Sequence, residues 1–89
     1  MGNKIDVDID ELERFAAQLQ QFNLELDLIV NKVENQFRSL GDSWRDDQYS
    51  KFSTEWHSTF NSVNHYLNEA PAYVLHLKKK AEKLREARA

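Results

Sequence analysis

Cysteine is absent from this chain of 89 residues, proline occurs once and glycine twice. Without cysteine, neither disulfides nor thiolate metal sites can support the fold. No apolar run approaches the roughly 20 residues of a membrane-spanning helix, so we expect a soluble chain without membrane insertion. The first thirty residues contain no apolar block before a cleavage site, so no Sec signal peptide is expected. The fold therefore has to be held by packing alone.

The mass of 10.5 kDa allows one domain, over residues 1–89, with a small core. Net charge is −3, but the charges are sorted along the chain. Residues 1–47 hold eleven acids and five bases, whereas residues 48–89 hold four acids and seven bases. This asymmetry can guide how the chain folds back on itself.

Apolar residues recur at steps of three and four along the first half of the chain, as on one face of an α-helix. Asp8 is a suitable N-cap and Glu11 follows three residues later, so a helix is predicted to begin near Ile9. We therefore predict a first helix over about residues 9–40. Its apolar row, taken as the face toward a second helix, comprises Leu12, Phe15, Leu19, Phe22, Leu26, Ile29, Val33, Phe37 and Leu40.

The next residue, Gly41, is the only glycine beyond position 2. Glycine commonly adopts the left-handed conformation just after a helix, and we predict that Gly41 ends the first helix in this way. Asp42 or Ser43 can cap a second helix, and if Ser43 is the cap, Asp46 occupies its third position. The turn is thus predicted at residues 41–43 and the second helix over about residues 44–87.

The second helix has an apolar row that passes through the single proline. Proline lacks an amide hydrogen and crowds the preceding turn of a helix. Because the row keeps its phase through Pro71, we predict one helix with a kink near residues 67–70, and a break into two helices is the alternative. The row comprises Tyr49, Phe52, Trp56, Phe60, Val63, Leu67, Ala70, Val74, Leu77, Ala81 and Leu84.

Two long helices joined by a short turn predict an all-α fold, an antiparallel two-helix hairpin with coiled-coil spacing. With the turn centred near residue 42, residue i lies opposite roughly residue 85 − i, since both helices rise equally. The basic segment from Lys78 to Arg85 is then expected to begin beside Asp6 to Asp8 and to extend past the N-terminus. Opposite charges meet at the open end of this hairpin, which favours the antiparallel arrangement.

Leu24 and Leu28 lie outside the apolar row of the first helix. Single exposed leucines are common on monomers, and this is one interpretation. Their spacing of four residues, in a chain short of buried area, favours a second packing face instead. We predict that two hairpins pair through this face as a four-helix-bundle dimer, either with a second copy or with a similar hairpin.

Catalytic and metal chemistry are not expected. His57, His65 and His76 are separated by eight and eleven residues, which places no two of them around one metal on a helix. Helix capping explains the acidic residues at the turn, so we predict no enzyme activity and no cofactor. The basic C-terminal segment contains no interleaved aromatic residue and suits a solvated helix end, so nucleic acid is not an expected partner.

The turn resembles the signature of the WXG100, or ESAT-6-like, family. Leu40, Trp44 and Phe52 match that signature, with Asp46 where the family has glycine. The resemblance covers the whole chain in length, paired amphipathic helices and absence of cysteine. It implies a helical hairpin that pairs into antiparallel four-helix bundles. It also implies a type VII secretion substrate, or the targeting partner of a larger effector, whose Trp44 lies on the surface read by the secretion ATPase.

The C-terminal export signal of that family, a tyrosine followed four residues later by Asp or Glu, is not present. Tyr66 is followed at that distance by Ala70, and Tyr73 by Leu77. The sequence therefore agrees with two functions. The first is a hairpin that leaves the cytoplasm without a Sec signal, or that targets an effector. The alternative is a cytoplasmic structural or adaptor module that oligomerises through the same hairpin.

Overall fold

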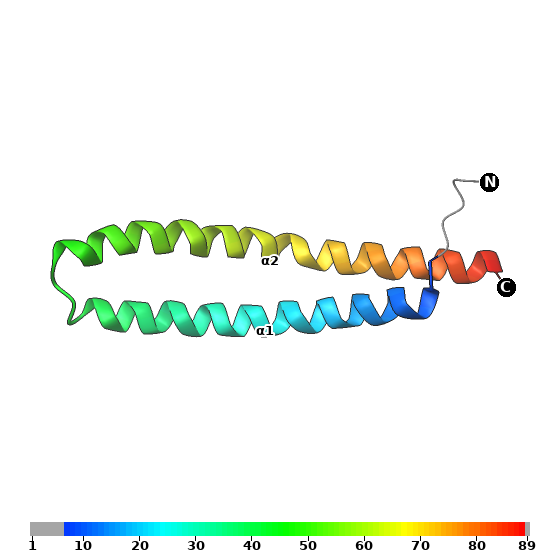
Figure 1. The fold of residues 1–89 in the computed structure, drawn as a ribbon, viewed down its shortest axis with the longest axis horizontal. Coiled ribbons are helices and arrows are strands. Elements are labelled where there is room, and N and C mark those ends of the chain that lie inside the picture. The colour runs from blue at the N-terminus through cyan, green and yellow to red at the C-terminus, as the bar shows by residue number, and fades with distance from the viewer. Residues whose placement is uncertain (1–6, 89) are drawn as a thin grey trace.

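The computed structural model describes residues 7–88 as two helices joined by a turn. Helix α1 spans Ile9–Gly41 and helix α2 spans Asp47–Arg88. The helices run antiparallel and side by side (Figure 1), and the molecule measures 64 × 25 × 16 Å. Residues 7–88 contain no strand. The predicted all-α antiparallel hairpin is confirmed.

Aspartate caps both helices at their N-termini. The side chain of Asp8 accepts hydrogen bonds from the backbone amides of Asp10 and Glu11, at 2.9 and 3.2 Å. Helix α2 begins at Asp47, three residues later than predicted, because its cap is Asp46. The hydroxyl of Ser43 instead donates to the carbonyl of Leu40. The turn is therefore longer than predicted and occupies residues 42–46.

Gly41 does not adopt the predicted left-handed conformation. It belongs to α1, and no residue from 7 to 88 has a positive φ. Asp42 follows it with right-handed helical angles, and the amides of Ser43 and Trp44 donate to the carbonyl of Leu40. A side chain at position 41 would collide with the hydroxyl of Tyr49. Glycine is therefore favoured here by the close approach of the Tyr49 side chain rather than by backbone conformation.

The predicted apolar row of α1 is only partly the face that packs on α2. Leu12, Leu19, Leu26 and Phe37 do face α2, but the other members of the predicted row are exposed. The inner row, defined as the residues of a helix that face the other helix, includes small and polar side chains that the apolar pattern missed. In α1 it comprises Ile9, Leu12, Ala16, Leu19, Asn23, Leu26, Val30, Glu34 and Phe37.

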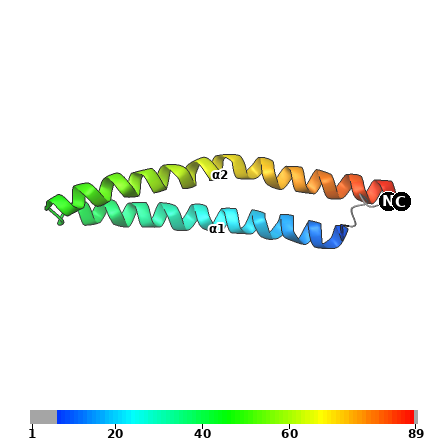
Figure 2. The ribbon, with the colours of Figure 1, turned by 45° about the horizontal axis from the view of Figure 1, so that its top comes forward.

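The inner row of α2 passes through Pro71 without a break. Pro71 lies inside α2, so the alternative of two separate helices does not occur. Figure 2 shows the direction of α2 changing in its yellow part, which precedes Pro71. The buried members of this row, Ala70, Val74 and Ala81, lie at and beyond the bend. Near the turn, Ser53 is half-buried in place of the exposed Phe52, so the row keeps its steps of three and four there.

The register of the two helices differs from the prediction. Lys78 donates a hydrogen bond to Gln20, and Arg85 pairs with Asp10 and Glu13. The basic segment therefore lies alongside the first turns of α1, deeper in the hairpin than predicted, and Asp6 lies outside the described residues. The longer turn contributes to this difference, because it moves the start of α2 along the chain. Opposite charges nevertheless meet at the open end of the hairpin, as the sorted charges predicted.

Candidate interaction surfaces

One long side of the hairpin carries a row of exposed apolar side chains. Phe15, Phe22 and Ile29 are each more than half exposed, with accessible fractions of 52, 51 and 58 %. Each directly precedes a residue of the inner row, so all three lie on the same side of α1. We call this surface the apolar flank. Its exposed members are Phe15, Phe22, Ile29, Val33 and Leu40 of α1 with Phe52 and Tyr73 of α2.

The contacts of α2 place Phe52 and Tyr73 on the same side as the α1 members. Residues that directly follow inner-row leucines pair with each other, as Glu13 does with Arg85 and Gln20 with Lys78. In an antiparallel pair these contacts fix one side of the hairpin, so residues that directly precede the inner row share the other side. Phe52 and Tyr73 are of this second kind. The apolar flank therefore spans both helices.

Aromatic rings gather around Phe37 at the turn end of the molecule. Phe37 is 7 % exposed, and four rings approach it with centroid distances of 5.2 to 6.3 Å. These rings belong to Tyr49, Phe52, Trp56 and His57 of α2. We call this set the hinge cluster. These ring contacts pack α1 against α2 beside the turn.

The motif residues Trp44, Asp46 and Phe52 come together beside this cluster. The indole Nε1 of Trp44 donates to Oδ1 of Asp46 at 2.8 Å. The same oxygen accepts from the backbone amides of Gln48 and Tyr49 at 2.9 and 3.3 Å. The ring of Trp44 is half-buried, edge-on to Tyr49 and tilted against Phe52. One carboxylate oxygen thus caps α2 and also orients Trp44, which glycine at this position could not do.

Replacing Asp46 tests these two roles separately. Asp46→Ala should lower the free energy of unfolding by about 1–2 kcal/mol through loss of the cap. Asp46→Ser keeps a capping oxygen on a side chain too short to reach the indole, so we expect little loss of stability but a changed Trp44 environment. Asp46→Asn, which keeps an acceptor for both bonds, serves as the control. Urea unfolding gives the stability, and the Trp44 indole proton signal in NMR spectra reports the second role. An indole signal unchanged in Asp46→Ser would contradict the orienting role.

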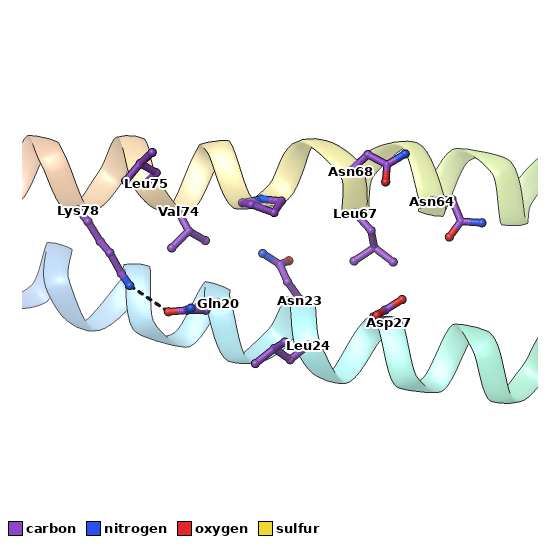
Figure 3. A pocket seen from close by; sticks show the side chains of 11 residues that line it. Gln20, Asn23, Leu24, Asp27, Asn64, Leu67, Asn68, Val74, Leu75 and Lys78 are labelled. Carbon is purple, nitrogen blue, oxygen red and sulfur yellow. Dashed lines mark hydrogen bonds between the residues drawn. The ribbon is translucent and has the colours of Figure 1, made fainter.

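The opposite side of the hairpin holds a groove of about 600 Å³ between the helices. Figure 3 shows its lining side chains, with Asn23 standing between the helices and Leu24 and Leu75 on its two lips. The groove lies where α2 bends, and Pro71 contributes only a short ring to it. Its lining comprises Gln20, Asn23, Leu24, Asp27, Asn64, Leu67, Asn68, Pro71, Val74, Leu75 and Lys78.

Of the predicted dimer face, Leu24 and Leu28, only Leu24 lines this groove. Leu24 forms part of the groove and is 58 % exposed, and Leu28 lies one turn further along α1 and is 73 % exposed. Neither residue is part of the apolar flank or close to the Trp44 motif in the chain. Their role as a dimer face stays a prediction.

The inner row contains one buried acidic side chain, Glu34, which is 4 % exposed. Its Oε2 accepts a hydrogen bond of 2.6 Å from Nε1 of Trp56, and its Oε1 accepts one of 3.1 Å from Nε of Arg38. The bond to Trp56 joins α1 to α2 in the interior. A second such bond runs from the hydroxyl of Tyr66 to Oδ1 of Asn23, at 2.7 Å. These two polar contacts fix the register of the helices.

At the open end, Arg85 binds two acidic residues of α1. Its Nη2 lies 3.1 Å from Oδ1 of Asp10 and 2.7 Å from Oε1 of Glu13. The hydrogen bond that the Arg85 guanidinium donates to Asp10, and then the one that it donates to Glu13, raise its pKa above the ordinary value. Because these groups are exposed to solvent, the pairing orients the helix ends more than it stabilises them.

Within residues 7–88, no helix combines the length and the apolar character needed to cross a membrane. In the same part of the chain, no three His, Cys, Asp or Glu side chains are grouped as a metal site would require. Comparisons of the chain with models of protein families, with curated proteins and with solved structures found no match. Evidence for the function therefore comes from the surfaces of the hairpin.

Proposed function

We propose that this chain is a non-catalytic interaction module of the WXG100 type, which pairs with a second copy or a similar hairpin as a four-helix bundle. The apolar flank is the observation that carries the proposal. A helix of such a bundle contacts two neighbours and needs a wider apolar face than a lone pair of helices. In α1 the inner row supplies the contact with α2, and the flank supplies the contact with another hairpin.

The shape of the flank supports this pairing. From Phe15 to Leu40 it runs for roughly 38 Å along α1, so a partner of similar length can cover it. Four of its seven exposed members are aromatic, and aromatic side chains are enriched at protein interfaces. An exposed apolar surface of this extent on a small domain is typical of an interaction site.

The flank predicts a dimer that charged substitutions disrupt. We expect Phe22→Glu combined with Ile29→Glu to weaken association through the flank at least about 100-fold, because both charges must be buried on pairing through this surface. Ser58→Glu, which adds a charge to the exposed outer face of α2, is the control and should leave the mass unchanged. Light scattering coupled to size-exclusion chromatography measures the mass in solution. A wild type that is monomeric at micromolar concentration, with no similar hairpin co-purifying, would contradict the proposal.

Export by a type VII system is the functional step of the proposal. We expect the protein in the culture medium of a host with a working system, alone or with its partner co-expressed, and only in the cells when the ATPase is inactivated. Trp44→Ala tests the turn motif in the same assay and should reduce export, with Ser58→Ala on the exposed outer face of α2 as the control.

The alternative, a structural or adaptor module that stays in the cytoplasm, is favoured by one contact. The hydroxyl of Tyr66 binds Asn23 within the hairpin, and no acidic residue follows Tyr66 at the spacing of the family export signal. Retention in the cells, even with a co-expressed partner, would support this alternative.

A further inference from the structure

We propose that the groove is a second interface between copies of this chain, which joins flank-paired dimers into larger assemblies. The proposal extends the proposed function, because it concerns the side of the hairpin that the flank dimer leaves open. The groove and the flank lie on opposite sides of a two-helix layer. A copy seated on one side therefore does not block the other.

The charges of the groove suit a second copy related by twofold symmetry. Asp27 lies at the end toward the turn and Lys78 at the end toward the helix termini. Two copies can face each other across a twofold axis that is perpendicular to the helices. Their grooves then run in opposite directions, so Asp27 of each copy lies at the Lys78 end of the other copy's groove. A symmetric contact requires such self-complementarity. The other polar lining residues are Gln and Asn, which carry no charge to repel their own copies.

The apolar lips fit the same arrangement. Leu24 lies about midway along α1 between Gln20 and Asp27, so the axis brings Leu24 of one copy against Leu24 of the other. Leu75, on the opposite lip, is 52 % exposed and is covered by the same docking. The groove carboxamides have both donors and acceptors and can bond to their counterparts across the axis.

Two separate symmetric interfaces on opposite sides of a thin molecule generate a stack of hairpins. We expect the wild-type mass to rise with concentration from two copies to four and more. Leu24→Glu should stop the assembly at two copies, and the milder Leu24→Gln should act in the same direction.

The flank variant, Phe22→Glu with Ile29→Glu, should still form pairs through the groove, and the combination with Leu24→Glu should be monomeric. Ser58→Glu should assemble like the wild type, and circular dichroism shows that each variant is helical.

Charge reversal provides the sharper test. Asp27→Lys alone, and Lys78→Glu alone, should each weaken the second association step about tenfold, since symmetry places two like-charge pairs at every contact. Asp27→Lys combined with Lys78→Glu restores opposite charges and should return the association to within about threefold of the wild type. Loss that the double variant fails to restore would overturn the proposed orientation.

The outcomes also separate this inference from the proposed function. A wild type that stays at two copies and is unaffected by Leu24→Glu overturns the groove interface and leaves the flank dimer standing. A pair that persists in the flank variant and disappears in Leu24→Glu supports the groove interface and overturns the flank dimer. A wild type that is monomeric at all concentrations overturns both.

Discussion

Phe37→Ala is expected to lower the free energy of unfolding by about 3–5 kcal/mol, the range for deleting a buried phenylalanine ring. Phe37 is the centre of the hinge cluster, and its loss leaves a cavity between Tyr49 and Trp56. These rings are held on a helix and cannot all move inward to fill it. Urea unfolding followed by circular dichroism measures the change.

Phe15→Ala is the matched control, because it removes the same atoms from an exposed position on the flank. For the unpaired hairpin its effect should be small. If hairpins pair through the flank, the stability lost in Phe15→Ala should grow with protein concentration. The stability lost in Phe37→Ala should be larger than that in Phe15→Ala at every concentration. Similar losses for the two variants in dilute solution would show that the hinge cluster is not the centre of stability.

The second large effect concerns the buried contact between Glu34 and Trp56. We expect Trp56→Phe to cost about 2–3 kcal/mol, because it removes a donor from a carboxylate that is buried from water. Glu34→Met should cost about 1–2 kcal/mol, because it leaves the indole hydrogen without its acceptor. The double variant has no unmatched polar group at this contact.

The two substitutions should therefore not add. We expect the double variant to be more stable than the sum of the single losses predicts by at least about 1 kcal/mol. Glu34→Gln, which retains an acceptor for Trp56, is the control and should be the mildest of the single changes. Additivity within about 0.5 kcal/mol would mean that the hydrogen bond contributes little to the fold.

The aspartate caps show how far residue type alone determines where the two helices begin. Asp8 caps α1 as predicted from its position before Ile9 and its spacing to Glu11. At the second helix, Asp42, Ser43 and Asp46 are all good caps by residue type. In the structure Asp46 is the cap, and its carboxylate also accepts from the indole of Trp44, whose ring packs on Tyr49 and Phe52. The predicted turn therefore overlaps the observed one at residues 42 and 43 but is too short.

The family resemblance named Trp44, Asp46 and Phe52 as one motif, and these residues do lie together. Their relation was not visible in the sequence. It depends on one oxygen of Asp46 accepting from both the indole and the backbone. Because Asp46 does two things at once, substitution by the family glycine would remove both the cap and the bond to Trp44.

The sequence by itself determined the two helices, the direction reversal near residue 42 and the attraction between oppositely charged ends. It could not determine which side of α1 faces α2. Leu12, Leu19 and Leu26 belong to two overlapping rows, one completed by Ile9, Ala16, Asn23 and Val30 and the other by Phe15, Phe22 and Ile29. Both rows have steps of three and four, and the second is more apolar.

Only the tertiary structure decided between these rows. The close approach of α2 favours the small Ala16, and the polar Asn23 and Glu34 are accepted inside because Tyr66 and Trp56 donate hydrogen bonds to them. Such partners lie more than twenty residues away in the chain, so no local pattern reveals them. The more apolar row was left outside, where it forms the flank. Within one chain, hydrophobic burial alone does not explain why the less apolar row packs on α2. If a second hairpin covers the flank, both rows are buried and the arrangement is explained.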